Sequence, residues 1–185
     1  DYAVTGVQTC ALPILLSGRI PTAGGTYICP GVEGGTNWFS PSYNPSSGLF
    51  YVMALESCQL LFAKPQAFAK GQTFYNTGSK LPSNEHSQKV LLALSLVDGK
   101  PVWRYPQAGN GRSWGGTMTT AGGLVFFGDD TESLEAVDAA TGRPLWHFNT
   151  GQMFHASPMT YAVDGVQYVS IAAGGDIFRD RKSVV

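Results

Sequence analysis

Hydrophobic and polar residues alternate along this chain in short runs that end at glycine-containing turns. The stretch from Ala136 to Trp146, AVDAATGRPLW, shows this arrangement most clearly. Ser133 to Ala139 predicts a strand, and Arg143 to Phe148 predicts the strand that returns beside it. Gly142 supplies the positive φ that a short hairpin loop needs. We expect Trp146 to point from the returning strand into a packed layer.

The same pattern occurs a second time, at Ala93 to Trp103 (ALSLVDGKPVW). Both copies begin with alanine, have glycine in the seventh place and end with tryptophan, and Trp103 and Trp146 lie 43 residues apart. A period near ~40 residues with about four short strands per repeat is typical of β-propeller blades. We therefore predict an all-β fold, a partial β-propeller.

Three other segments extend this interpretation. Gly48 to Leu55 (GLFYVMAL) is apolar on successive residues, which predicts a strand buried on both faces. Ala156 to Gly175 predicts a further hairpin that turns at Asp164-Gly165. Lys64 to Glu85 has no apolar period and is rich in Gly, Ser, Asn and Lys, so we expect a long loop inserted in the first blade. The chain thus contains two nearly whole blades and pieces of a third.

Composition limits the possible partners. Only 14% of the 185 residues are charged, the formal net charge is −1, and lysine and arginine do not cluster. These features argue against a nucleic-acid partner. No apolar run approaches the ~20 residues that are needed to span a bilayer.

The two ends of the chain look foreign to the rest. Ala11 to Ile14 can be encoded by GCT CTT CCG ATC, and the reverse complement of this string encodes Asp180 to Ser183. We therefore interpret residues 1–14 and 180–185 as translated sequencing adapter and assign residues 15–179 to propeller blades. Cys10 is then not a native cysteine. From spacing alone, Cys29 and Cys58 form either one disulfide or two buried thiols.

Several longer segments resemble one family, the dehydrogenases that use pyrroloquinoline quinone (PQQ). Together with the repeat, Cys29 to Val52, Trp114 to Gly128 and Pro158 to Gly174 are similar to the C-terminal blades of quinoprotein alcohol and methanol dehydrogenases. The resemblance implies the last two to three blades of an eight-bladed propeller, in which Trp103 and Trp146 dock against neighbouring blades. It also implies a disulfide between Cys29 and Cys58.

The resemblance further implies a function. An alcohol would be oxidised by hydride transfer to PQQ, beside a Ca²⁺ or lanthanide ion whose ligands lie upstream of this chain. Electrons would pass to a cytochrome c or a membrane quinone in the periplasm. This chain alone is expected to be inactive. Two alternatives stay open: an aldose or polyol dehydrogenase of the same family, and a non-enzymatic propeller scaffold similar to BamB, against which the GGTNW segment argues.

Three residues are candidates for the cofactor site on the basis of this resemblance. Asn37, in GGTNW, matches an amide that hydrogen-bonds the quinone, and Trp114, in SWGG, matches a tryptophan that contacts it. Trp38 is expected to line the adjoining pocket. Read from the residues alone, Asn37 can also cap a turn, and Trp114 can also be a core residue between blades.

No residue of this chain matches the catalytic aspartate or the metal ligands of that family. The aspartates of the described motifs sit in turn sequences, and we expect structural turn roles for Asp98, Asp129, Asp130 and Asp138. Asp176 is a candidate to face the central funnel. His86, His147 and His155 do not have metal-ligand spacing.

Overall fold

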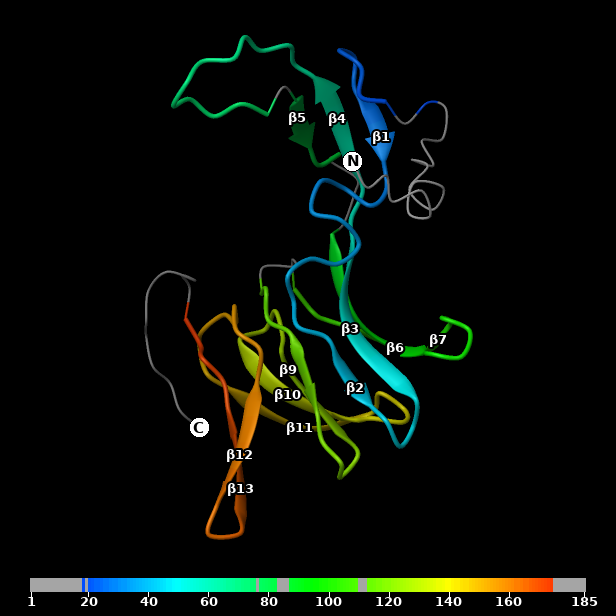
Figure 1. Cartoon of the computed structure of the whole chain (residues 1–185), viewed down its shortest axis with the longest axis vertical. Coiled ribbons are helices and arrows are strands. Elements are labelled where there is room, and N and C mark those ends of the chain that lie inside the picture. Colours follow the sequence, from blue (N-terminus) through cyan, green and yellow to red (C-terminus); the bar gives the residue numbers. More distant parts are fainter. Residues whose placement is uncertain (1–17, 19, 76, 83–86, 110–112, 175–185) are drawn as a thin grey trace, which may run out of the picture.

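The computed structural model describes residues 18, 20–75, 77–82, 87–109 and 113–174. In this part of the chain the fold is all-β, as predicted, with thirteen strands in four antiparallel sheets (Figure 1). Two four-stranded sheets form the body of the molecule, a small three-stranded sheet lies at one end, and a two-stranded hairpin lies at the other (Figure 1). The described residues contain no helix that is long and apolar enough to cross a membrane. The adapter interpretation and Cys10, His86 and Asp176 fall outside the described residues.

The first four-stranded sheet, which we call blade A, has the order β2-β3-β6-β7. Leu49, Tyr51, Met53 and Leu55 of β3 are buried, whereas the residues between them are half-buried. Our expectation of burial on both faces is therefore met on one face only, because no other described sheet packs on the second face. The strands of blade A are β2 (Ser42–Asn44), β3 (Leu49–Glu56), β6 (Gln88–Ser95) and β7 (Pro101–Pro106).

The second four-stranded sheet, blade B, repeats the first. Its order is β8-β9-β10-β11. Ala93 pairs with Trp103 in blade A and Ala136 pairs with Trp146 in blade B, and a β-bulge follows each alanine. The strands of blade B are β8 (Thr117–Thr119), β9 (Leu124–Gly128), β10 (Ser133–Asp138) and β11 (Pro144–Asn149).

The turns of the two repeated hairpins are also equivalent. The Gly99 amide donates to the Ser95 carbonyl in blade A, and the Gly142 amide donates to the Asp138 carbonyl in blade B. Both glycines have positive φ, 70° and 71°, a conformation that is costly for other residues. The sequence repeat is therefore a repeat of one hairpin, bulge and turn included.

Trp103 of blade A docks on the turn of blade B. Its Nε1 donates to the Ala139 carbonyl at 3.0 Å, and the residue is only 9% exposed. A Cβ on Gly142 would lie 2.6 Å from the indole, so this position needs glycine for space as well as for φ. Burial of such a side chain contributes on the order of 2–3 kcal/mol, which makes the contact a principal link between the blades.

Trp146 holds the equivalent place in blade B but is not buried. It is 46% exposed and stacks on Phe148, with ring centroids 6.3 Å apart. Our expectation that Trp146 points into a packed layer is therefore wrong for this chain. The physical reason is that the described residues contain no further blade whose turn would cover the indole as Ala139 and Gly142 cover Trp103.

The C-terminal hairpin confirms its prediction. It consists of β12 (Met159–Val163) and β13 (Val166–Ser170), and it turns at Asp164-Gly165, which both have positive φ. Most of its residues are exposed.

The segment inserted between β3 and β6 is more regular than expected. Its two strands, β4 (Gln59–Ala63) and β5 (Thr77–Lys80), form a sheet with β1 (Thr26–Ile28), which precedes β2 in the chain; the order is β1-β4-β5. The expectation of a loop throughout Lys64 to Glu85 is wrong for β5. This strand is polar and gives no hydrophobic signal, but it pairs with the free edge of β4. Cys29 and Cys58 form a disulfide where the chain leaves β1 and enters β4, so the bond joins the two connections at the base of this sheet.

Candidate functional site

The segment before β2 in blade A lies beside the segment before β8 in blade B. Ser40 precedes β2 of blade A, and its carbonyl accepts a hydrogen bond from the Thr117 amide of β8 in blade B at 2.8 Å. The hydroxyls of Ser42 and Thr117 are also 2.8 Å apart. A Cβ on Gly116 would lie 2.5 Å from the Ser40 carbonyl oxygen, so glycine allows this close approach. The residues just before β2 and β8 are therefore brought together.

This approach brings three aromatic side chains together, Trp38, Phe39 and Trp114, which we call the aromatic cluster. The ring centroids of Trp38 and Trp114 are 5.0 Å apart with an interplanar angle of 37°, and those of Phe39 and Trp114 are 5.3 Å apart. Phe39 is 3% exposed and Trp38 is 61% exposed. The cluster thus has a buried base and an open indole, a surface on which a planar ligand can stack.

Asn37 lies directly before the aromatic cluster, and its side chain holds its own turn. Its Nδ2 donates to the Glu33 carbonyl at 2.9 Å, and its Oδ1 accepts from the Trp38 amide at 2.9 Å. These bonds leave one N–H and one lone pair of the amide available. The residue is exposed. The structure therefore shows Asn37 as a turn cap that still has hydrogen-bonding capacity, and its predicted contact with a quinone stays a prediction.

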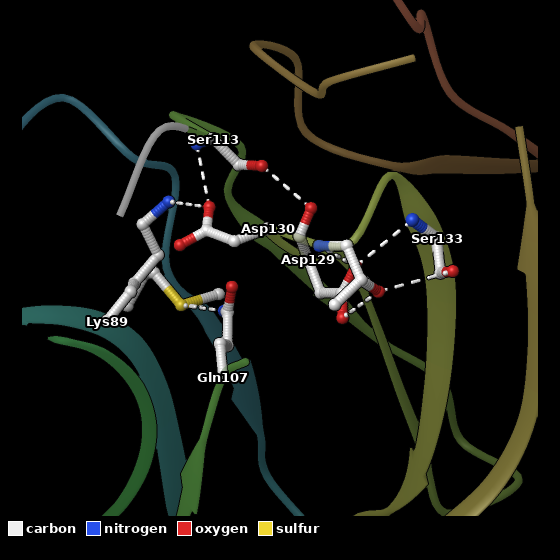
Figure 2. A network of polar contacts seen from close by, with 8 residues as sticks. Lys89, Gln107, Ser113, Asp129, Asp130 and Ser133 are labelled. Carbon is white, nitrogen blue, oxygen red and sulfur yellow. Dashed lines mark hydrogen bonds and ion pairs between the residues drawn. The ribbon is translucent and has the colours of Figure 1, made fainter. Parts of the chain in front are cut away.

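A buried ion pair between Lys89 and Asp130 (Figure 2) lies close to Phe39 of the aromatic cluster. Lys89 Nζ is 3.0 Å from Asp130 Oδ1, and both side chains are 1% exposed. Burial lowers the pKa of the Lys89 ammonium, and the negative charge of Asp130 acts in the opposite direction. Lys89 Nζ also lies 5.7 Å from the centroid of the Phe39 ring. We expected a turn role for Asp130; this is wrong, because its carboxylate is buried and pairs with a lysine of the other blade.

The other aspartates have the turn roles that we predicted. Asp129 accepts from the amides of Thr131 and Ser133, and Asp138 accepts from the amides of Ala140 and Thr141. Asp98 accepts from the Lys100 amide. The hydrogen bond from the Thr141 hydroxyl is the main cause that lowers the pKa of Asp138.

Candidate metal ligands do not gather in the part of the chain that the structure covers. Within it, no three His, Cys, Asp or Glu side chains are placed so that they could hold a metal ion. His147 is exposed on β11, and His155 is half-buried after that strand.

The sequence analysis did not identify Phe39, Lys89 or Ser113, and it assigned Asp130 a turn role instead of an ion pair. The one local signal for Lys89 was its place in a strand, directly before the apolar run Val90 to Leu94, because lysine is seldom fully buried unless it has a partner. Its partner could not be found from the pattern, since Asp130 lies 41 residues away.

The chain matches a known family model over residues 106–169. The description of that family is "Glucose/ethanol/alcohol dehydrogenase, beta-propeller domain", under the name PQQ. The matched region begins at the end of β7 and covers blade B and most of the following hairpin.

Curated relatives match a larger part of the chain. It is 36% identical to the quinoprotein alcohol dehydrogenase PedH of Pseudomonas putida over 178 residues, which is 92% of this chain and 30% of PedH. It is 37% identical to a quinohemoprotein alcohol dehydrogenase of Comamonas testosteroni over 78% of this chain and 22% of that protein. The chain therefore spans less than a third of the length of these relatives.

Solved structures show the same similarity in three dimensions. The crystal structure of the Comamonas testosteroni quinohemoprotein alcohol dehydrogenase matches with a TM-score of 0.72 and 32% identity, over 81% of this chain and 24% of that one. A europium-containing methanol dehydrogenase matches with a TM-score of 0.76 and 26% identity, over 84% of this chain and 28% of that one. Blades A and B thus correspond to part of a larger propeller.

Proposed function

Because this chain belongs to the quinoprotein alcohol dehydrogenase family, whose members are built on the PQQ β-propeller, we propose that the full-length protein oxidises alcohols with PQQ. We further propose that this chain supplies one wall of the cofactor site. The observation that carries the proposal is the aromatic cluster where the segments before β2 and β8 meet, with the ring centroids of Trp38 and Trp114 5.0 Å apart.

The residues at this junction fit a planar, oxygen-rich cofactor. Trp114 packs against buried Phe39 and against exposed Trp38, so that the cluster offers an aromatic face. Asn37 retains an N–H that can donate to a carbonyl or carboxylate oxygen. When bound, PQQ would accept the hydride from the alcohol carbon. The residues of this chain would bind and orient the ring system and exclude water from one side of it.

The remaining parts of the site would come from outside this chain. We expect the base that takes the hydroxyl proton, and the ligands of a Ca²⁺ or lanthanide ion, to lie in other blades. The europium-containing methanol dehydrogenase, a structural neighbour, supports the inclusion of a lanthanide.

The surroundings of the enzyme are also part of the proposal. The disulfide between Cys29 and Cys58 supports an oxidising compartment such as the periplasm. Two relatives are named 1-butanol dehydrogenase (cytochrome c) and 1-butanol dehydrogenase (quinone). We therefore propose a cytochrome c or a membrane quinone as the electron acceptor.

A PQQ titration of alcohol oxidation tests this function. The full-length apoprotein is assayed with a small primary alcohol and an artificial dye acceptor at increasing PQQ concentrations, for the wild type, Asn37→Ala and Asn149→Ala. Asn149 is the matched control, because it also caps its own turn but lies at the end of β11. Loss of one hydrogen bond to a cofactor oxygen should raise the PQQ concentration at half-maximal rate about five- to tenfold for Asn37→Ala only. Absence of PQQ-dependent oxidation in the wild type would contradict the proposed function.

A further inference from the structure

Asp130 uses one carboxylate oxygen to join the two blades and the backbone next to Trp114. Its Oδ1 accepts from Lys89 Nζ of blade A at 3.0 Å and from the Ser113 amide at 2.7 Å. Figure 2 shows these two bonds converging on one oxygen. Oδ2 has no hydrogen-bond partner among the described residues. The Ser113 amide is thus bound to a carboxylate whose only ion-pair partner in the described structure is Lys89.

Two more bonds fasten the same short segment. The Ser113 hydroxyl donates to the Asp129 carbonyl at 2.7 Å (Figure 2), and the Trp114 amide donates to the carbonyl of fully buried Phe154 at 2.8 Å. Three hydrogen bonds, to Asp130, Asp129 and Phe154, therefore restrain residues 113 and 114. Such fastening limits the rotation of the backbone and thus the positions that the indole can reach.

A contribution to folding stability does not by itself explain why Lys89 and Asp130 are buried as an ion pair. Two charges lose their hydration when their side chains are 1% exposed, and a buried pair is often no more stable than apolar residues of similar size. Lys89 also contacts the aromatic cluster from behind, because its Nζ faces the Phe39 ring, which in turn packs on Trp114. Each partner of the pair is therefore one contact away from Trp114: Asp130 through the backbone of Ser113, and Lys89 through the Phe39 ring.

We propose that Asp130 is a positioning residue for Trp114, and that Lys89 is the counter-charge that allows the carboxylate to be buried there. Asp130 acts through the Ser113 amide and does not itself contact the cofactor. As far as it concerns PQQ, this inference rests on the proposed function; the position of the Trp114 indole can be measured without it.

Two double variants of the full-length protein separate positioning from folding. Lys89→Met/Asp130→Asn removes both charges and keeps an oxygen that can accept from the Ser113 amide. Lys89→Met/Asp130→Ala removes both charges and that acceptor. Neither variant leaves a buried charge without a partner, so both should fold. Ser113→Pro keeps the ion pair and removes both the amide donor to Asp130 and the hydroxyl donor to Asp129, so it tests the restraint of this segment as a whole.

The readouts are the ¹⁹F NMR resonance of Trp114 in 5-fluorotryptophan-labelled apoprotein, assigned with Trp114→Phe, and the Kd for PQQ from fluorescence quenching. We expect the Asn-containing variant to keep the wild-type resonance and a Kd within about twofold, whereas the Ala-containing variant and Ser113→Pro shift or broaden the resonance and raise the Kd about fivefold or more.

The resonance of Trp114 and the binding of PQQ test the positioning role and the proposed function separately. An unchanged Trp114 resonance in the Ala-containing variant and in Ser113→Pro would overturn the positioning role, whether or not PQQ binds. A shifted resonance in a protein whose wild type does not bind PQQ would support the positioning role and contradict the proposed function.

Discussion

At the scale of single residues, the contact between Trp103 and Gly142 determines how the two blades meet. The indole occupies the space that a side chain at position 142 would need, and it donates to the neighbouring Ala139 carbonyl. The tryptophan and the glycine of the repeat therefore act between sheets: the tryptophan of one blade meets the turn glycine of the next.

The substitution Gly142→Ala tests this contact in the full-length protein. It should lower the free energy of unfolding by about 1–3 kcal/mol more than Gly123→Ala does, because the new Cβ overlaps the Trp103 ring. Gly123 is the matched control, since its φ is also positive, at 80°, and a Cβ there would meet no atom within 4 Å. Urea unfolding gives both values. Equal effects of the two substitutions would show that the contact is not tight.

At the scale of elements, the features that depend on local sequence were predictable, whereas those that depend on contacts between distant residues were not. The repeated hairpin was predictable because turn glycines and the Ala–Trp spacing are local features of the sequence. Strand β5 was not, since its residues are polar and only the edge of β4 makes it a strand. The family resemblance assigned Trp38 and Trp114 to one cofactor site, whereas the residue pattern alone did not bring them together and Phe39 was not predicted. Trp38 and Trp114 lie in different blades, and a chain pattern does not state which loops meet.

The turn between β10 and β11 has a pH dependence of known sign. Hydrogen bonds from Thr141 and Ala140 lower the pKa of Asp138 below its usual value near 3.8. The ionised carboxylate therefore stabilises the folded state above this pH, and the stabilisation is lost as the pH falls through the lowered pKa.

Thermal unfolding of the full-length protein at several pH values checks this sign. Asp138→Ala should unfold at a lower temperature than the wild type at pH 6, and the difference should shrink as the pH falls from about 4 toward 2, where the wild-type carboxyl is protonated. A difference that stayed constant over this range would mean that the charge of Asp138 has no part in the turn.

At the scale of the whole molecule, blade B exposes apolar side chains on its last strand. Blade B ends in β11, where Leu145, Trp146 and Phe148 are all more than 40% exposed. Trp146 and Tyr168 line an apolar hollow of about 410 Å³ between this blade and the hairpin β12–β13. The exposure of Trp146 could not be predicted from the repeat, because the pattern does not show whether a neighbouring turn covers the indole as Ala139 and Gly142 cover Trp103.

The 185-residue chain on its own is predicted to be inactive. We propose that it supplies one wall of the cofactor site, and its described residues contain no group of His, Cys, Asp or Glu side chains that could hold a metal ion. A dye-linked assay of the purified chain with PQQ, Ca²⁺ and a primary alcohol should give the rate of the protein-free control. Turnover above that rate would show that a complete catalytic site lies within this chain.

The affinity of the full-length apoprotein for PQQ, measured for the wild type and for Trp114→Ala, tests the central claim most directly. If the aromatic cluster forms a wall of the cofactor site, the substitution should raise the Kd about tenfold, because it removes the ring that packs against both Trp38 and Phe39. A wild-type protein that binds PQQ and a Trp114→Ala variant with the same Kd would place the cofactor elsewhere and contradict the account.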